Sequence, residues 1–361
     1  MPPCIRLVSS EAEHPMSVGE GGIPKISRAA MWHDSHLLSD KRKPIRIRSV
    51  CDGSRAIRAG HNLQRVRKRM IDVIIPAYNA SKTLGRALAS LAAQTDKDFK
   101  VTVVNDCSEW DEHCAMIRTA TRYENENLDV RVISTPENCG AGMARQYGID
   151  NTDGEWITFL DADDVLMPYA IEAFKAMIAN EPHMNMLHSS FYKQRKTSDG
   201  EIELIEMQEG HTWLHGKLYR RAFLEKYEIR NNPQFSRWAD DSYFNAMCTE
   251  LTPVTISRLP MYIWTHTDGS ATTADPSRSR RDLKVFMGAM YAACIHTLRY
   301  KGEIGFIGNV LNNISRNVAN SDMPTLDADE SALYDSLCKM YDEHGIKPQP
   351  QPKRKRIFKK R

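Results

Sequence analysis

Apolar and polar positions alternate in blocks from residue 71 onward. Short apolar runs of strand length are each followed by a segment in which apolar residues recur every three or four positions, the pattern of an amphipathic helix. Strands and helices alternating at short spacing predict a parallel sheet covered by helices on both faces. The predicted strands span 71–76, 100–105, 130–134 and 155–160, and the helices between them span 80–93, 110–123 and 142–149.

The alternation becomes less regular after residue 164. We expect a helix over 169–179, a strand over 184–192 and a hairpin turn around 198–200. No apolar run reaches the roughly 18 residues that a membrane-spanning helix needs. We therefore predict an α/β protein with a mostly parallel sheet and no transmembrane segment. Three amphipathic segments predict C-terminal helices over 281–300, 304–318 and 329–343.

Charge divides the chain into three parts. The net charge is only +3, but residues 1–70 carry 14 Lys/Arg against 6 Asp/Glu, and residues 347–361 carry 8 against none. The first 69 residues show no sustained periodicity, so we expect a disordered basic extension, with Met70 as an alternative start of translation. The Pro-rich, basic end of the chain predicts a disordered tail that is attracted to polyanions or to an acidic membrane surface.

Four regions are expected in total. They are the extension at 1–69, a folded α/β domain at 70–275, a helical segment at 276–345 and the tail at 346–361. The 8 cysteines are scattered, without the spacing of a zinc site or the density of a disulfide scaffold. We therefore expect a cytoplasmic protein, at most peripheral at the inner face of a membrane.

Acidic residues gather where one predicted strand ends. The apolar run that begins at Trp156 stops in three carboxylates, Asp161, Asp163 and Asp164. Asp is also common in solvated turns and helix caps, so this cluster alone does not define a site. Carboxylates at a strand end nevertheless suit a hard divalent cation that bridges to phosphate. Ligands of open α/β sheets bind at this edge of the sheet.

Three more strand-end elements accompany the acidic cluster. Together with Asp161-Ala162-Asp163, and in this order and spacing, they resemble glycosyltransferase family 2, whose catalytic domain has the GT-A fold. The resemblance covers about residues 71–270. It implies an inverting enzyme that transfers a sugar from a nucleoside diphosphate, UDP by family analogy, to an acceptor hydroxyl. The three elements are Pro76-Ala77-Tyr78-Asn79, Asn105-Asp106-Cys107-Ser108 and the segment from Asn138 to Arg145.

The resemblance implies roles on the donor side of the site. Asp106 matches the acid that accepts an N–H of the nucleobase, while Cys107 stands where Gly is frequent, at a turn that favours positive φ. Asp163 and Asp161 match the acids that hold Mn²⁺ or Mg²⁺, with Asp161 also near the ribose. Asp164 fits a cap of the next helix. The other residues implied to bind the nucleotide sugar are Pro76, Tyr78, Asn79, Asn138, Gly140, Arg145 and Gly216.

A paired-acid motif downstream completes the implied catalytic machinery. In Trp238-Ala239-Asp240-Asp241 the last residue matches the catalytic base, which takes the proton of the acceptor hydroxyl. Asp240 replaces the more common Glu and, like Trp238, would support the base. His266 matches a histidine that completes the metal site in many GT-A enzymes.

The segment from Trp213 to Arg220 resembles the family's glycine-containing loop. Gly216 would shape the acceptor side of the donor pocket, while Lys217 and Arg220 could serve simply as surface cations.

Two other interpretations of the sequence stay open. A sugar nucleotidyltransferase should have a Gly-rich loop with Arg or Lys after the first strand, where this chain has Pro76-Ala77-Tyr78-Asn79. A protein associated with nucleic acid or another polyanion would use the basic ends, and could glycosylate modified DNA. The acceptor is equally open among glycans, lipid-linked sugars, proteins and modified nucleic acids.

Overall fold

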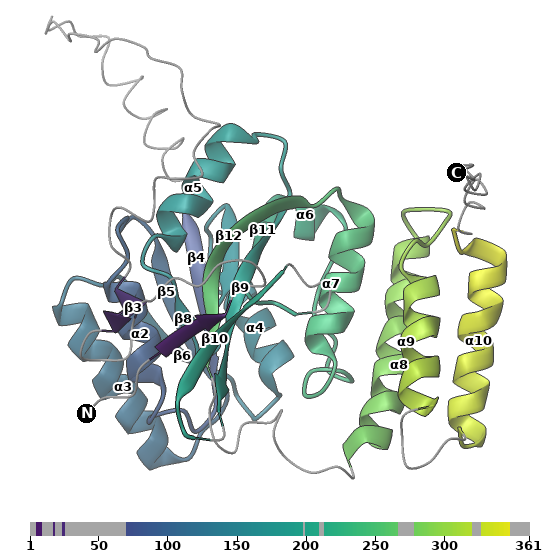
Figure 1. Ribbon diagram of the computed structural model, residues 1–361, viewed down its shortest axis with the longest axis horizontal. Coiled ribbons are helices and arrows are strands. Elements are labelled where there is room, and N and C mark those ends of the chain that lie inside the picture. The colour runs from purple at the N-terminus through teal and green to yellow at the C-terminus, as the bar shows by residue number, and fades with distance from the viewer. Residues whose placement is uncertain are drawn as a thin grey trace, which may run out of the picture.

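The computed structural model describes residues 5–8, 17–18, 24–25, 70–197, 199–208, 213–265, 278–319 and 326–346. Within these residues a ten-stranded sheet runs through the centre, and helices cover both of its faces (Figure 1). The predicted α/β class is therefore confirmed. Most of the expected basic extension, the tail and His266 lie outside the described residues.

The parallel half of the sheet is built from β6, β5, β4 and β7, in this spatial order. The central strand β4 (Ile71–Ala77) pairs with β5 (Lys100–Asn105) on one side and with β7 (Trp156–Phe159) on the other. The edge strand β6 (Val130–Ser134) pairs with β5. All four predicted strands are confirmed. β4, β5 and β7 are buried almost throughout, as expected for continuous apolar runs in a parallel sheet, and the edge strand β6 is partly exposed.

The other half of the sheet is antiparallel around its centre. β11 (Lys217–Arg220) runs antiparallel to β7 and to β9 (Met186–Lys196), and β9 forms the predicted hairpin with β10 (Ile202–Met207). The sheet is therefore mixed, because the chain returns through antiparallel strands after β7. The remaining strands are β1 (Ile5–Val8), β2 (Ser17–Val18), β3 (Pro24–Lys25), β8 (Val165–Leu166) and β12 (Thr255–Trp264).

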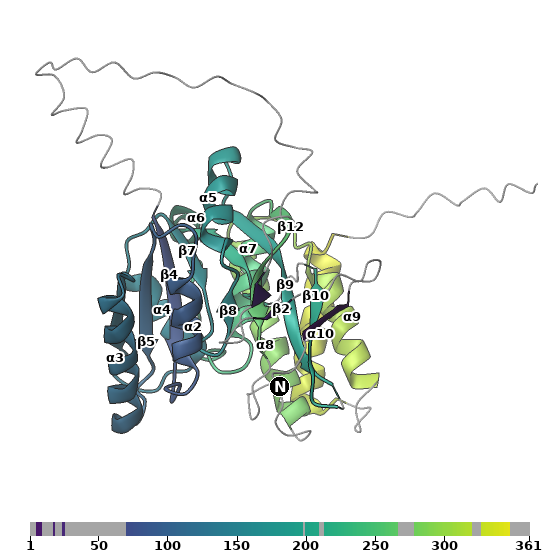
Figure 2. The ribbon, with the colours of Figure 1, turned by 60° about the vertical axis from the view of Figure 1, so that its left-hand side comes forward.

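Each face of the sheet has its own set of helices and its own apolar core (Figure 2). One core is completed by α2 (Leu84–Ala92), α3 (Trp110–Asn125) and α5 (Ala170–Asn180). The other core includes α4 (Ala141–Asp150), α6 (Arg221–Lys226) and α7 (Asp240–Leu251).

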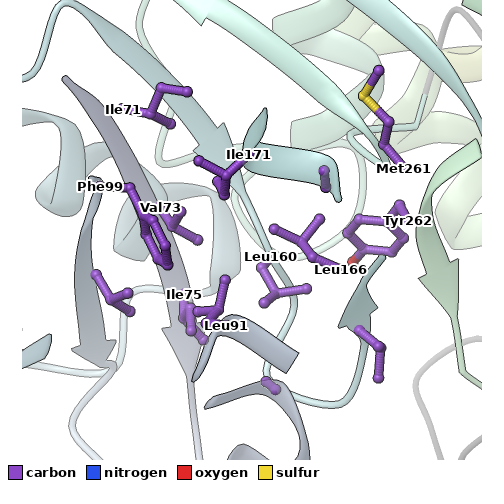
Figure 3. Packing of buried hydrophobic residues seen from close by; sticks show 14 of the residues in the cluster. Ile71, Val73, Ile75, Leu91, Phe99, Leu160, Leu166, Ile171, Met261 and Tyr262 are labelled. Carbon is purple, nitrogen blue, oxygen red and sulfur yellow. The ribbon is translucent and has the colours of Figure 1, made fainter. Parts of the chain in front are cut away.

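Alternating side chains of β4 point into the two cores. Ile71, Val73 and Ile75 point into the first, and Ile74 belongs to the second. Figure 3 shows the first core, in which Tyr262 of β12 packs near Leu166. Burying this ring fixes β12 against the end of β7, where the acidic cluster begins.

Three C-terminal helices extend the second core. Figure 1 shows α7 between the sheet and these helices, and Met287, Ile314 and Leu337 join Phe244 of α7 in one continuous cluster. The three predicted helices are thereby confirmed. No helix in the described ranges has the length and apolar character needed to cross a membrane. The helices are α8 (Arg278–Leu298), α9 (Ile307–Ala319) and α10 (Ala328–His344).

Candidate active site

The candidate site lies where β4, β5 and β7 end. The parallel register sets Ala77 beside Asn105 and Ile74 beside Phe159. Residues that follow these strands therefore meet at one edge of the sheet, as expected for an open α/β sheet. They are Tyr78 and Asn79 after β4, Asp106 after β5, and Asp161 to Asp164 after β7.

Asp106 organises the loop before α4. Its buried carboxylate accepts hydrogen bonds from the backbone N–H groups of Cys139 (2.9 Å) and Gly140 (2.7 Å) and from the Thr135 hydroxyl (3.0 Å). Burial, followed by the nearby Asp106 carboxylate, raises the pKa of the Cys139 thiol to about 12. Asp106 thus holds the predicted loop in place, and its contact with a nucleobase stays a prediction.

The ends of β4 and β5 are tied together at the same edge. The backbone N–H of Asn79 donates to Ser108 Oγ at 2.9 Å, and the side chain of Asn79 accepts from the backbone of Glu109 at 3.2 Å. Cys107 has φ +55° and Asn79 has φ +48°, so the turn that usually favours Gly is kept with Cys. Tyr78 lies next to Asn79 in this turn. It is 51% exposed and therefore available to a ligand.

The first turns of α4 and α7 are packed against each other. Ser236 is fully buried; its carbonyl accepts from the Gly142 N–H (2.9 Å), and its hydroxyl accepts from the Met143 N–H (2.7 Å). A Cβ on Gly142 would lie 2.6 Å from Cβ of Asp240, so only Gly permits this approach. Gly140, with φ +85°, turns the chain into α4.

Arg145 links two acids from different parts of the chain. Its side chain is buried, and its guanidinium lies 2.6 Å from Asp161 Oδ1 while also pairing with Asp240. Burial opposes the charge, but the two carboxylates hold the pKa of Arg145 above its usual value. Arg145 therefore anchors the acid cluster.

The paired acids begin α7. Burial raises the pKa of Asp240 to about 7 despite the opposing effect of Arg145. Burial also raises the pKa of Asp241, whose carboxylate accepts a 2.6 Å hydrogen bond from the N–H of Ser242. A carboxylate with a raised pKa is a stronger base, which suits proton abstraction near neutral pH. Trp238 lies on the turn before the helix, 38% exposed.

Asp164 does not cap a helix, contrary to the expectation from sequence. α5 begins only at Ala170, and the buried Asp164 carboxylate instead accepts from the Thr265 N–H (2.7 Å) and the Tyr262 hydroxyl (2.5 Å). Burial, with Asp161 and Asp163 nearby, raises its pKa well above the usual value. The side chain therefore fixes the end of β12 beneath the acidic cluster.

His215 enters the same corner from the loop before β11. Its ring packs against Tyr262 and Trp264 in tilted arrangements, with centroid distances of 4.8 Å and 5.1 Å. Burial lowers the pKa of His215 to about 4, so the imidazole is neutral at physiological pH. One ligand-type atom from each of Asp161, Asp164 and His215 lies within 4.8 Å of the others.

The neighbouring Gly216 and Lys217 are fixed by packing. Gly216 has φ +63°, and a Cβ there would overlap Ser189 Oγ. Lys217 is not a surface cation: it is 1% exposed, and its ammonium group donates to the carbonyl of Trp213. Burial lowers its pKa to about 7. Arg220 is partly exposed and pairs with Glu155 at 2.9 Å.

Residues 72–247 match the family model of Glycosyl transferase family 2. The chain contains a family 2 glycosyltransferase domain. The domain spans every strand-end element described above and both acids that begin α7.

Similar proteins agree with this assignment. The chain is 40% identical over 92 residues to the amylovoran biosynthesis glycosyltransferase AmsB of Erwinia amylovora, covering 26% of this chain and 30% of AmsB. It is 29% identical over 187 residues to the poly(ribitol-phosphate) beta-N-acetylglucosaminyltransferase TarS of Staphylococcus aureus, covering 48% of this chain and 31% of TarS. This chain therefore spans about a third of the length of these two relatives.

A solved structure confirms the GT-A fold of the family 2 domain. It is that of S. aureus TarS residues 1–349 in complex with UDP-GlcNAc, with a TM-score of 0.58 and 20% sequence identity. The match covers 76% of this chain and 81% of the TarS fragment.

The family 2 domain brings several predicted residues into direct contact. Asp106 meets Gly140, and Arg145 meets both Asp161 and Asp240. His215 received no role from the sequence, although it stands next to Gly216 in a recognised motif. No local pattern indicates that His215 approaches Asp164, because β11 reaches β7 only through sheet pairing.

Proposed function

We propose that the protein is a metal-dependent inverting glycosyltransferase that transfers a sugar from a UDP-sugar to an acceptor hydroxyl. The observation that carries this proposal is the bridge from Asp161 through the buried guanidinium of Arg145 to Asp240. It joins the strand-end acids, which suit the donor diphosphate, to the helix that begins with the paired acids. The acids proposed to bind the donor diphosphate and the proposed general base therefore lie at one edge of the sheet.

The donor side supports a nucleoside diphosphate. Tyr78 offers an exposed ring on which a base can stack. Pro76, Asn79 and Asn138 border the same edge as parts of the elements that resemble the family. TarS was solved with UDP-GlcNAc on this fold, and we extend the UDP-sugar class of donor to this chain.

The charges around the site support a divalent cation. Carboxylates outnumber the nearby cations, and the pKa values of Asp164, Asp240 and Asp241 are raised, mainly by burial and also by neighbouring acids. Oxygen ligands suit Mg²⁺ and Mn²⁺. Mn²⁺ or Mg²⁺ would be held by Asp161 and its neighbours, with Asp163 and His266 as the ligands implied by family resemblance. The ion would neutralise charge on the departing diphosphate.

The chemistry assigned to this chain is a single displacement. Asp241 takes the proton of the acceptor hydroxyl while the acceptor oxygen forms its bond to the anomeric carbon. The bond from that carbon to the diphosphate oxygen breaks, and the diphosphate leaves with the electron pair. Attack from the opposite face inverts the configuration. Arg145 keeps Asp161 ionised and holds Asp240, and hence the start of α7, in position.

The acceptor is proposed as a hydroxyl of a polysaccharide or glycoconjugate. The names of AmsB and TarS link two relatives to amylovoran biosynthesis and to poly(ribitol-phosphate), the second of which is a polymer.

A panel of nucleotide sugars tests the proposed reaction. The purified full-length protein is incubated with each donor and Mn²⁺, and nucleoside diphosphate release is followed with and without candidate polymer acceptors. We expect release from at least one UDP-sugar, reduced by EDTA and by Asp241→Asn. If no nucleotide sugar binds or turns over, the proposal is wrong.

A further inference from the structure

The corner below the acidic cluster contains three side chains of metal-ligand type. Asp161 follows β7, Asp164 lies in the turn after it, and His215 precedes β11, 51 positions further along the chain. Their ligand-type atoms all lie within 4.8 Å of one another. Two carboxylates and an imidazole from three separate segments form a donor set that can surround one cation.

His215 is held in this corner without a hydrogen-bond partner among the described residues. Its side chain is 10% exposed, and its Nδ1 is buried and unpaired. Its Nε2 lies 4.0 Å from Asp164 Oδ2, beyond hydrogen-bond distance. Leaving a buried polar atom unpaired is unfavourable, and none of the described residues supplies a hydrogen-bond partner for Nδ1 of His215.

The aromatic neighbours orient the imidazole. Tyr262 and Trp264 lie at interplanar angles of 34° and 32° to the His215 ring, and Phe191 packs at 5.1 Å. Such packing restricts ring rotation and keeps Nε2 directed to the acids.

Both carboxylates have the supporting contacts that metal ligands usually have. Arg145 orients Asp161 from one side, while Tyr262 and the backbone of Thr265 orient Asp164 from the other. Each carboxylate oxygen has more than one lone pair, so these contacts leave capacity for a cation. Hydrogen bonds of this kind fix ligands in place and tune their basicity.

We propose that His215, Asp161 and Asp164 are direct ligands of the divalent cation. This assignment rests on the proposed metal dependence and refines it, since the sequence had favoured Asp163 and His266. Asp163 is not a member of the three-residue group. An imidazole ligand favours Mn²⁺ over Mg²⁺, which prefers oxygen ligands and retains its waters.

Pulsed EPR of bound Mn²⁺ tests the histidine ligand directly. The full-length protein is measured with Mn²⁺ alone and with Mn²⁺ plus UDP, and we expect ¹⁴N coupling from a coordinated imidazole. His215→Phe preserves an aromatic ring but has no nitrogen. It should remove the coupling and weaken Mn²⁺ binding about 10-fold or more. His296→Phe is the matched control, because His296 is half-buried and packs against Tyr300 with ring centroids 5.5 Å apart, and it should retain the coupling.

The outcomes separate this assignment from the alternatives. No ¹⁴N coupling in the wild-type protein, or coupling that survives in His215→Phe but is lost in His266→Phe, would overturn it. Asp164→Asn should weaken Mn²⁺ binding more than Asp163→Asn, and the reverse order would remove Asp164 from the ligand set. Circular dichroism verifies that each variant is folded. Mn²⁺ coordination by His215 without turnover of any nucleotide sugar would retain this inference while rejecting the proposed function.

Discussion

Arg145 and Asp161 form an ion pair in which Nη2 of the buried guanidinium lies 2.6 Å from Oδ1 of the partly exposed Asp161. The same guanidinium pairs with Asp240, so one cation supports two acids that belong to different elements. Removing one partner of a buried ion pair is costly because the other charge stays buried and unpaired. This arrangement makes Arg145 the residue on which the geometry of the site depends most.

Arg145→Met should lower the free energy of unfolding by about 3–5 kcal/mol and abolish transfer activity. Arg145→Lys should recover part of the stability, because a lysine retains the charge but lacks the planar fork that bridges two carboxylates. Urea unfolding at pH 8 measures both effects. The control Arg230→Met breaks an exposed pair with Asp150 and should cost at most about 1 kcal/mol. Equal costs for Arg145→Met and Arg230→Met would contradict this account.

Asp240 should give the stability of the protein a measurable pH dependence. Its pKa is about 7 in the folded protein against an ordinary 3.8, so the folded state holds the proton more tightly than the unfolded chain. Stability from this group is therefore present at low pH and is lost as the pH rises through about 4 to 7. Asp240→Asn removes the titration. The free energy of unfolding of Asp240→Asn minus that of the wild type should therefore increase from about pH 4 to 7 and then level off.

Urea unfolding at a series of pH values measures this difference. Its size is expected to be a few kcal/mol at most, because one pKa unit corresponds to about 1.4 kcal/mol. Asp153→Asn is the control, since the Asp153 side chain is 88% exposed, and its difference from wild type should stay flat. A difference for Asp240→Asn that falls with rising pH would show that the carboxyl is not protonated in the folded state.

Asp241→Asn should lower kcat about 10²- to 10⁴-fold, the usual contribution of a general base. Binding of UDP should stay within about twofold of wild type, since the base acts on the acceptor hydroxyl rather than on the nucleotide. Transfer kinetics and calorimetric titration with UDP separate the two quantities. Asp111→Asn changes an exposed acid in the first turn of α3 and should alter neither. Loss of UDP binding in Asp241→Asn would assign this acid to the donor instead.

Gly216→Ala should destabilise the protein more than Gly200→Ala does. Both glycines have positive φ, +63° and +87°, so each alanine adopts an unfavourable backbone conformation that costs about 1–2 kcal/mol. A Cβ at Gly200 meets nothing within 4 Å, whereas one at Gly216 overlaps Ser189 Oγ, which adds about 1–3 kcal/mol.

Thermal unfolding of the two alanine variants measures the difference. The double variant Gly216→Ala/Ser189→Ala should recover part of the loss, because it removes the overlapping oxygen. Equal destabilisation by the two single substitutions would show that the loop moves away from Ser189.

Much of the fold could be predicted because helix and strand periods are local. The strands at 71–77 and 100–105, the hairpin between β9 and β10, and the C-terminal helices all follow from the pattern of apolar positions. The orientation of the later strands could not be predicted in this way. β11 lies between β7 and β9 only because three separated segments pair, and no single segment encodes that order.

The candidate site likewise combines residues that local patterns predict with contacts that depend on tertiary packing. Motif order alone indicated Asp106, Asp161 and Asp241, because these residues follow strands or begin a helix. The role of Asp164 was predicted wrongly, since Asp is common at helix caps and its partner Thr265 is 101 positions away. Lys217 was interpreted as a surface cation because its burial depends on packing around β11.

The sequence by itself determined the α/β order, the family resemblance and which strand ends carry acids, because these properties depend on neighbouring positions and motif spacing. Only the tertiary structure decided that one buried guanidinium holds Asp161 and Asp240, 16 and 95 positions away from Arg145. It also decided that His215 faces Asp164. Both relationships depend on which strands pair and how closely two helix ends approach, and these long-range contacts leave no periodic signal in the chain.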